Sequence, residues 1–356
     1  MIGKAINIAG QIIGLDQPCF IIAEAGVNHN GDLELARKLV DAAVSAGANA
    51  VKFQTFVADR LVTTDAPKAE YQKETTETTE SQWEMIHRLE LSKESHQALM
   101  NYCQDKEILF MSSPFDELSA DLLDELGLPV FKIPSGEITN LPYLRHVARK
   151  QKPMIISTGM SYLSEVETAV LVIEEEQNHD YVLLQCTSNY PADPADANLA
   201  AMETMARAFG APVGYSDHTR GIEVPLAAVA LGACVVEKHL TTNRALSGPD
   251  HRASLEPEEF TSMVRGIRSV EAALGHGRKE PAASEADTAL VARKSLVAAR
   301  YIPAGTVLTE DLFAIKRPGT GLPPEMIKYL LGQTLRVNVQ AGCLFHIEML
   351  GKSTES

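Results

Sequence analysis

Two lysines stand inside short apolar runs, where charged side chains are rare. Lys52 lies in NAVKFQT (49–55) and Lys132 lies in PVFKIPS (129–135), and both runs end in a hydroxyl-bearing residue. A lysine ammonium accompanied by hydroxyl donors suits a phosphate or carboxylate group. A buried lysine can also be the nucleophile of a Schiff-base aldolase. The two lysines therefore predict either an anion-binding site or a lysine aldolase.

Two histidines follow other runs of the same kind. His218 comes directly after APVGYSD (211–217), and His239 ends ACVVEKH (233–239). A lone histidine is more often a core residue whose hydrogen bonds are satisfied, and the spacing of this pair is not a zinc signature. Two imidazoles with open remaining positions nevertheless suit a catalytic divalent metal ion. The pair therefore predicts a metal site.

The elements that must position these side chains form a regular series. Between most of the apolar runs lies one amphipathic segment, as at 33–47, 141–150 and 163–175. Apolar strands that alternate with helices predict a parallel sheet covered on both faces. Eight such units over about 240 residues predict a (β/α)₈ TIM barrel, whereas a doubly wound sheet often opens with a glycine fingerprint that is missing here. The eight runs are 19–25, 49–55, 107–113, 129–135, 152–158, 180–186, 211–217 and 233–239.

The functional side chains of a barrel come from the C-terminal ends of its strands, and side chains along a strand alternate between its two faces. Polar strand ends can simply meet solvent, but polar groups at all eight ends favour a site. The selected residues are Glu24; Lys52 and Gln54; Ser112 and Ser113; Lys132, Ser135 and Glu137; Ser157 and Thr158; Thr187, Ser188 and Tyr190; Ser216, Asp217 and His218; and Glu237 and His239.

One connection between runs is unusually long. About 50 residues separate the second and third runs, and they include the polar stretch 68–85. Loops of this length are uncommon unless they cover a site, and in a barrel this loop lies on the face where active sites form. We expect the insertion to cover the site, and the alternative is a decorative insertion.

The composition of the chain changes after the predicted helix 257–274. Residues 275–290 are polar and small, which predicts a linker. Residues 291–356 contain short β-branched segments between Pro and Gly turns, which predicts a mainly β domain. The predicted organisation is therefore a barrel at 1–274, a linker at 275–290 and a small domain at 291–356. Such a small domain has a limited core and gains stability by docking on another surface.

The charge and composition exclude several classes of partner. Lys plus Arg is 32 and Asp plus Glu is 47, so the net charge is −15. An acidic surface repels nucleic acid and anionic lipid, so neither partner is expected. No window approaches the ~18 apolar residues of a membrane span, and the first ten residues do not resemble a signal peptide. Five widely spaced cysteines suit reduced, buried thiols in a cytoplasmic protein.

Nine motifs, met in order along the chain, resemble those of the sialic acid synthase family. The family condenses phosphoenolpyruvate with an N-acylated hexosamine to make nine-carbon 2-keto acids. The resemblance implies a (β/α)₈ barrel followed by a C-terminal antifreeze-like (SAF, β-clip) domain. The motifs are IIAEAGVNHNG (21–31), VKFQT (51–55), FKIPSGEITNLPYL (131–144), STGM (157–160), CTSNYP (186–191), GYSDHT (214–219), EKHLT (237–241), GPDHRASLEP (248–257) and IKRPG (315–319).

The resemblance also implies roles for residues at the matching positions. His218 and His239 would hold one divalent ion, Mn²⁺, Mg²⁺ or Co²⁺, and Glu24 and Glu137 are the acid/base candidates. Arg317 would reach the sugar bound by a neighbouring subunit in a domain-swapped homodimer. The residues that would bind phosphoenolpyruvate are Lys52, Ser113, Lys132, Ser135, Ser157 and Ser216, and those that would face the sugar are Gln54, Tyr190 and Asp250. Ser188 would also bind substrate.

Two positions depart from the pattern of the family. Ser188 stands where some members have Asn, which puts that hydrogen bond in doubt, and Ser113 stands where many have Thr, which keeps the hydroxyl. The sugar stays open between N-acetylmannosamine, which leads to N-acetylneuraminate, and 2,4-diacetamido-2,4,6-trideoxymannose, which leads to N,N'-diacetyllegionaminate. Two other hypotheses stay open: a Schiff-base aldolase, and a carbohydrate-binding protein with an inactive barrel.

Overall fold

The computed structural model describes residues 5–69, 72–73, 76 and 80–351. It divides into two compact units, Met1–Gly275 and His276–Ser356, which are described separately below. Part of the predicted stretch 68–85 and the two ends of the chain lie outside the described residues.

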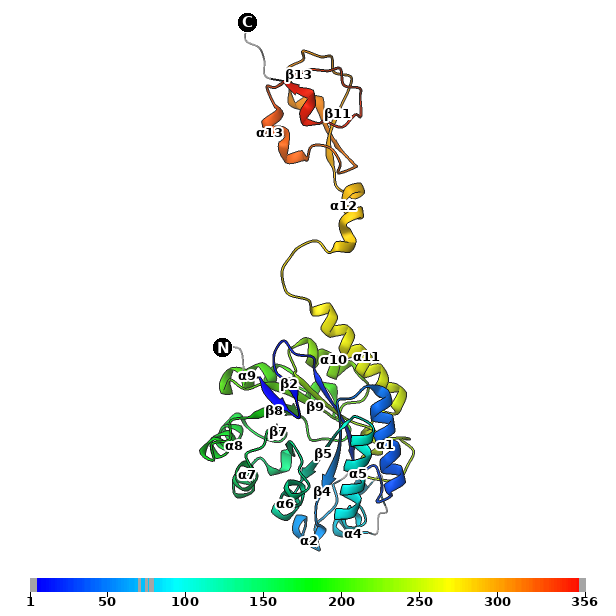
Figure 1. The fold of residues 1–356 in the computed structure, drawn as a ribbon, viewed down its shortest axis with the longest axis vertical. Coiled ribbons are helices and arrows are strands. Elements are labelled where there is room, and N and C mark those ends of the chain that lie inside the picture. Colours follow the sequence, from blue (N-terminus) through cyan, green and yellow to red (C-terminus); the bar gives the residue numbers. More distant parts are fainter. Residues whose placement is uncertain (1–4, 70–71, 74–75, 77–79, 352–356) are drawn as a thin grey trace. The chain divides into compact units, whose positions relative to one another are not determined.

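Eight parallel strands form the sheet of the first unit (Figure 1), in the order β5-β4-β3-β10-β9-β8-β7-β6. The strands at the two ends of this order, β5 and β6, also contact each other, so the sheet curls into a near-closed barrel. Each strand lies in one of the eight predicted runs or extends at most one residue beyond its C-terminal end, which confirms the predicted fold. The strands are β3 (Phe20–Gly26), β4 (Ala50–Thr55), β5 (Leu109–Pro114), β6 (Phe131–Ile133), β7 (Met154–Ser157), β8 (Tyr181–Cys186), β9 (Val213–Asp217) and β10 (Val235–His239).

Helices surround this sheet (Figure 1). In the first of them, α1, apolar side chains at Ala36, Leu39, Val40 and Ala43 are buried, because they repeat on one face of the helix. The helices of the unit are α1 (Leu33–Ala46), α2 (Ala58–Leu61), α4 (Gln82–His87), α5 (Lys93–Asp105), α6 (Glu117–Glu125), α7 (Leu141–Ala148), α8 (Leu163–Glu175), α9 (Ala200–Phe209), α10 (Glu223–Ala230) and α11 (Pro257–Leu274).

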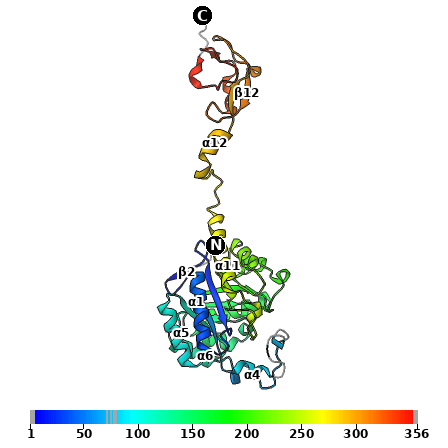
Figure 2. The ribbon, with the colours of Figure 1, turned by 90° about the vertical axis from the view of Figure 1, so that its right-hand side faces the viewer.

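A short hairpin precedes the barrel and has no counterpart in the sequence-based expectation. Its strands are β1 (Ile6–Ile8) and β2 (Gln11–Ile13). The hairpin's buried isoleucines pack with residues that begin the barrel strands, such as Phe20 and Val235. The hairpin and the helices α2 and α4 of the insertion lie at opposite ends of the unit (Figures 1 and 2). The hairpin therefore closes the N-terminal end of the barrel and leaves the C-terminal end to the insertion.

The second unit contains two small antiparallel sheets, β11 with β12 and β13 with β14, as expected for a mainly β domain. Its own core includes Leu296, Ile302, Leu335 and Phe345. The predicted linker is partly helical, because α12 covers an Ala- and Leu-rich segment. The elements are α12 (Ala286–Ala292), β11 (Ser295–Ala298), β12 (Phe313–Lys316), α13 (Ile327–Leu330), β13 (Thr334–Leu335) and β14 (Leu350–Gly351).

All five cysteines are free thiols, four of them buried and Cys343 exposed. Within the residues that the structure describes, no helix has the length and apolarity needed to cross a membrane.

Candidate active site

A cavity of about 410 Å³ opens at the C-terminal end of the barrel. All eight strands contribute to its lining, because each ends with a side chain that turns inward. The predicted site residues that line it are Glu24, Lys52, Gln54, Ser113, Lys132, Ser135, Ser157, Ser188, Tyr190, Ser216, His218, His239 and Asp250. The tertiary structure therefore brings most of the predicted site residues together.

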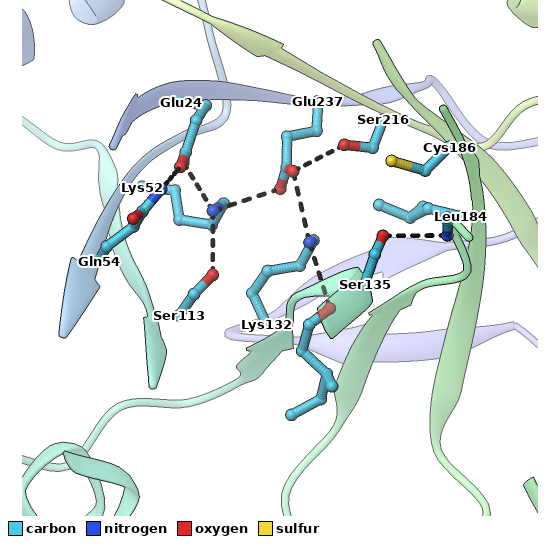
Figure 3. A network of polar contacts seen from close by, with 12 residues as sticks. Glu24, Lys52, Gln54, Ser113, Lys132, Ser135, Leu184, Cys186, Ser216 and Glu237 are labelled. Atoms are coloured by element: carbon cyan, nitrogen blue, oxygen red, sulfur yellow. Dashed lines mark hydrogen bonds and ion pairs between the residues drawn. The ribbon is translucent and has the colours of Figure 1, made fainter. Parts of the chain in front are cut away.

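Lys52 lies at the centre of a buried polar network (Figure 3). Its Nζ is 2.6 Å from Glu24 Oε2 and 3.7 Å from Glu237 Oε2, and it donates to Ser113 Oγ at 3.0 Å. Burial alone would lower the pKa of Lys52, but the carboxylates of Glu237 and Glu24 together raise it. Lys52 is therefore held as an ammonium ion.

Lys132 joins the same network through Glu237 (Figure 3). Its Nζ is 3.4 Å from Glu237 Oε1, which also accepts a hydrogen bond from Ser216 Oγ at 2.9 Å. Burial lowers the pKa of Lys132, and Glu237 offsets only part of that effect. The two lysines thus flank one carboxylate and differ in the direction of their pKa shifts.

Glu237 was placed on the same strand face as His239 by its spacing, but the sequence assigned it no role. The structure places its carboxylate between Lys52 and Lys132, where the two ammonium groups lower its pKa against the effect of burial. Alternation with His239 selects Glu237 from the sequence, but its pairing with both lysines is visible only in the structure.

Glu24 is the buried carboxyl group best suited to exchange a proton. Burial raises its pKa to about 7, although Lys52 acts in the opposite direction. Gln54 donates from Nε2 to Glu24 Oε1 at 3.1 Å and orients the carboxyl group. A group that titrates near neutral pH can act as either an acid or a base.

Ser135, Ser157 and Ser188 add hydroxyl groups to the cavity lining. The Oγ of Ser135 accepts a hydrogen bond from the Gly159 amide at 3.0 Å, whereas the buried Ser157 Oγ has no hydrogen-bond partner among the described residues. A Cβ atom at Gly159 would lie 2.3 Å from Ser188 Oγ and 2.8 Å from Ser135 Oγ. A side chain at residue 159 would displace the hydroxyls of Ser135 and Ser188, so this position requires glycine.

The two histidines lie side by side, with ring centroids 5.5 Å apart, and Tyr190 lies against both rings. His218 Nδ1 is 2.7 Å from the carbonyl oxygen of Thr187 and donates to it. Burial alone would lower the pKa of His218, but Cys186 and the Thr187 carbonyl raise it, so a metal ion held at Nε2 would displace a proton there. Burial and the neighbouring His218 hold the pKa of His239 well below its usual value. Its imidazole is therefore neutral, the form that binds metal ions.

These features fit a divalent ion held by two imidazoles. The Nδ1 of His239 is buried without a hydrogen-bond partner in the part of the chain that the structure describes. Across the same residues, no three His, Cys, Asp or Glu side chains form a group that could hold a metal. The protein would thus supply two ligands, and substrate or water would supply the others.

Cys186 also lines the cavity, although the sequence predicted it only as a buried thiol. Its Sγ is 3.8 Å from His218 Nδ1. Burial would raise the pKa of this thiol, but His218 is the main reason that it is instead lowered to about 7.

Asp250 completes the lining beside the histidines. Its side chain is buried, and burial raises its pKa to about 6. Its backbone carbonyl oxygen accepts a hydrogen bond from Ser254 Oγ at 2.7 Å, which holds this turn.

Six predicted site residues are not part of the cavity lining: Ser112, Glu137, Thr158, Thr187, Asp217 and Arg317. Ser112 and Asp217 each lie next to an inward-facing residue on the same strand, so alternation turns their side chains away from the cavity. Glu137 lies on the short 3₁₀ helix η1 (Ser135–Glu137), and its Oε2 accepts from Asn140 Nδ2 at 2.8 Å. Arg317 belongs to the second unit, where its Nε donates to the carbonyl oxygen of Ala292 at 2.9 Å. The roles of Glu137 and Arg317 stay predictions.

The long insertion after β4 does reach the cavity, as its length predicted. Described residues of this segment that line the cavity are Phe56, Leu61, Val62, Gln72, Gln82, Met85, Ile86 and Leu89. Helix α4 begins with a capping box, in which Ser81 and Glu84 bond each other's backbone amides. The insertion therefore forms part of the site.

Comparison with known proteins places this architecture in a family. Residues 39–279 match the model of the NeuB family, and residues 293–351 match the SAF domain. An N,N'-diacetyllegionaminic acid synthase of Legionella pneumophila is 50% identical over 342 residues, which cover 94% of this chain and 96% of that protein. A protein of the same description from Campylobacter jejuni is 48% identical and covers 89% of this chain and 96% of its own length.

A solved structure agrees with these matches. The N-acetylneuraminic acid synthetase of Leptospira borgpetersenii superposes with a TM-score of 0.71 at 38% identity, covering 81% of this chain and 95% of that chain. A barrel with this cavity, followed by a SAF domain and matched along nearly its whole length, leaves one assignment: the chain belongs to the NeuB family.

Proposed function

We propose that this protein condenses phosphoenolpyruvate with the open-chain form of an N-acylated hexosamine, giving a nine-carbon 2-keto acid and phosphate. One observation carries the proposal: two buried lysines and several hydroxyls converge on one cavity in a protein of net charge −15. This is a local cationic lining suited to an anionic substrate. The names of the relatives support the same reaction class.

The reaction forms one carbon–carbon bond and breaks one carbon–oxygen bond. Carbon 3 of phosphoenolpyruvate attacks the sugar aldehyde, and the aldehyde oxygen becomes a hydroxyl group. Water adds to the cationic carbon 2, and the tetrahedral intermediate loses phosphate to leave the ketone. The two protons of the water end on the new hydroxyl and on phosphate, so the atoms and charges balance.

The residues of the cavity divide this work. Lys52, Lys132 and the serine hydroxyls bind the phosphate and carboxylate groups and hold carbon 3 near the aldehyde. Glu24 is the acid/base candidate that lines the cavity, and its pKa of about 7 lets it take a proton from the attacking water and return it to the sugar oxygen. A divalent ion held by His218 and His239 would supply polarisation of the aldehyde oxygen.

Glu237 has a separate part in this scheme. Its single carboxylate offsets part of the positive charge of the two ammonium groups. Each lysine must then exchange part of its interaction with Glu237 for the substrate's phosphate or carboxylate. Ser216 donates a hydrogen bond to Glu237. Its hydroxyl could therefore also turn from Glu237 to the bound substrate.

The direct test is release of phosphate from phosphoenolpyruvate in the presence of N-acetylmannosamine or 2,4-diacetamido-2,4,6-trideoxymannose. We expect phosphate release to require one of the two sugars, and we expect the sugar product to be a nine-carbon 2-keto acid. Phosphate release without sugar, or no release with either sugar, would contradict the proposal.

A lysine aldolase is the second candidate, because burial lowers the pKa of Lys132 and so favours a nucleophilic amine. Borohydride treatment in the presence of pyruvate separates the two reactions. A covalent adduct on Lys132 would support the aldolase, and the synthase predicts none.

We also propose that Arg317 serves the cavity of a neighbouring subunit in a domain-swapped homodimer, as the resemblance implies. The arginine lies in the second unit, close to a helical connection, and its side chain is exposed. The four buried free thiols further support a cytoplasmic location.

A further inference from the structure

Asp250 reaches the cavity from a loop and not from a strand of the barrel. The loop follows β10 and spans residues 240–255, and a β-bridge between Leu240 and Leu255 joins its two ends. Pro249 and Asp250 are the residues of this loop that line the cavity. Because β10 ends at His239, contacts outside the barrel sheet must fix the position of the Asp250 carboxylate.

The chemistry of the two substrates decides which of them meets Asp250. Its carboxylate is buried and accepts no hydrogen bond from the residues that the structure describes. A carboxylate repels the phosphate and carboxylate groups of phosphoenolpyruvate, whereas it accepts hydrogen bonds from hydroxyl and amide groups. The hexosamine carries such groups, so it is the substrate that meets Asp250.

Asn30, in the turn after β3, holds one side of this loop. Its Nδ2 donates to the carbonyl oxygen of Ser247 at 2.9 Å, which leaves its Oδ1 to face His251 Nε2 at 3.3 Å. An amide oxygen can only accept, so the His251 Nε2 donates to it. The other ring nitrogen, Nδ1, lies 2.7 Å from Thr241 Oγ1. Asn30 is thus connected to three points of the loop, one of them the residue that follows Asp250.

Asn28, in the same turn, holds the other side of the loop. Its Nδ2 donates to the carbonyl oxygen of Leu240 at 2.9 Å and to Ser254 Oγ at 2.8 Å. Ser254 Oγ in turn donates to the backbone carbonyl oxygen of Asp250 at 2.7 Å. The Oδ1 of Asn28 is buried without a partner in the described part of the chain, which costs free energy. The benefit of Asn28 therefore lies in what its Nδ2 holds.

We propose that Asn28 and Asn30 are positioning residues that hold the Asp250 carboxylate where it meets the hexosamine. This inference rests on the proposed function. Asn28 acts through Ser254, and Asn30 acts through His251. The loop packs closely on Asn30, because a Cβ atom at Gly248 would lie 2.8 Å from Asn30 Oδ1. A loop held in this way is formed before the sugar binds, and groups that are already oriented need no rearrangement during the reaction.

Two small truncations break the arrangement without touching a residue that lines the cavity. Ser254→Ala removes the hydrogen bond to the Asp250 carbonyl, and Asn30→Ala removes the connection to His251. The matched controls make the same changes at exposed positions: Ser269→Ala on α11 and Asn101→Ala on α5. For each protein, kcat/KM is measured with the sugar that the wild type uses, together with the KM for phosphoenolpyruvate and the thermal midpoint.

We expect Ser254→Ala and Asn30→Ala each to lower kcat/KM for the sugar about tenfold, because a small misplacement of a group that orients substrate can cost up to ~10²-fold. The KM for phosphoenolpyruvate should stay within about twofold of the wild-type value, because the lysines that bind it are not held by this loop. The two control variants should change neither quantity.

The decisive comparison repeats both truncations in an Asp250→Ala background. A residue that acts through Asp250 loses its effect once the carboxylate is gone, so each truncation should then lower kcat/KM by less than about twofold. A defect of the fold alone would lower kcat/KM by the same factor in both backgrounds. If Asp250→Ala turns over too slowly for this comparison, the dissociation constant of the sugar, measured by calorimetry, replaces kcat/KM.

The results that would overturn the inference differ from those that would overturn the proposed function. Unchanged sugar kinetics in both truncations, equal losses in the two backgrounds, or a larger effect on phosphoenolpyruvate than on the sugar would refute the positioning role, while turnover by the wild type upheld the synthase. Absence of turnover by the wild type with either sugar would refute the proposed function itself.

Discussion

Lys238 and Asp217 form an ion pair inside the protein, between the two strands that lead to the histidines. Nζ of Lys238 is 2.5 Å from Asp217 Oδ2, and neither side chain has any exposed surface. The two residues are register partners on β10 and β9, and each is adjacent in sequence to His239 or His218. Because side chains alternate along a strand, the pair lies on the face of the sheet opposite the cavity.

Lys238→Met should destabilise the protein strongly, because it leaves the Asp217 carboxylate buried without its counterion. Removal of one partner of a buried pair costs about 3–5 kcal/mol. The measurement is urea unfolding at pH 7. The double variant Lys238→Met/Asp217→Leu should be more stable than the sum of the single effects predicts, and simple additivity would contradict a direct interaction.

Chelation should abolish activity, and Mn²⁺ should restore it, because two imidazoles suit a borderline divalent ion. His218→Ala and His239→Ala should each lose activity and bind Mn²⁺ much more weakly in calorimetry, while His179→Ala, an exposed histidine, should match the wild type. Full turnover in excess chelator would exclude the metal role.

Lys52→Met and Lys132→Met should weaken the use of phosphoenolpyruvate far more than they change the KM for the sugar. Loss of a charge-assisted contact costs ~1.5–3 kcal/mol, which is about ten- to hundredfold in kcat/KM. Lys93→Met provides the control, since Lys93 is an exposed residue of α5. If phosphoenolpyruvate kinetics barely change, the two lysines do not bind it.

Stability should fall in mild acid because two buried histidines resist protonation. Burial lowers the pKa values of His29 and His251 to about 4, and His29 Nδ1 accepts a hydrogen bond from the Gly31 amide at 3.0 Å, which an imidazolium cannot do. Between pH 6.5 and 4 the unfolded chain binds more protons at these two histidines than the folded chain does. Their contribution to the free energy of unfolding is therefore fully present above pH 6.5 and is lost as the pH falls toward 4.

Each of these histidines contributes roughly 3 kcal/mol to that loss. Urea unfolding between pH 4 and pH 7 measures it, and His29→Asn should flatten the slope relative to the exposed control His179→Asn. An unchanged slope in His29→Asn would show that His29 is not a source of the acid sensitivity.

Activity should require two chains if Arg317 serves a neighbouring barrel. A mixture of the inactive variants Arg317→Ala and His239→Ala, under conditions that exchange subunits, should regain part of the activity, because one site of each heterodimer keeps both residues. Truncation after residue 285 should leave a folded barrel with little synthase activity. If exchange is demonstrated and no activity returns, Arg317 does not act across the interface.

Much of the fold and part of the site could be predicted from local sequence pattern. The eight strands were found because a buried parallel strand is apolar along its whole length, and strand-end residues such as Lys52 and His239 followed from alternation. Both properties depend on residues close together in the chain. The β1–β2 hairpin escaped prediction because three-residue strands are too short to show a period.

Only the tertiary structure decided which groups meet across the barrel. Glu237 lies between Lys52 and Lys132 because curvature brings β10 close to β4 and β6, which are not its neighbours in the sheet. Glu137 stands near a strand end in sequence, yet the turn into η1 directs its carboxylate to Asn140. Sequence periodicity determines the face of a strand on which a side chain lies, whereas closure of the sheet determines which distant side chains come within bonding distance.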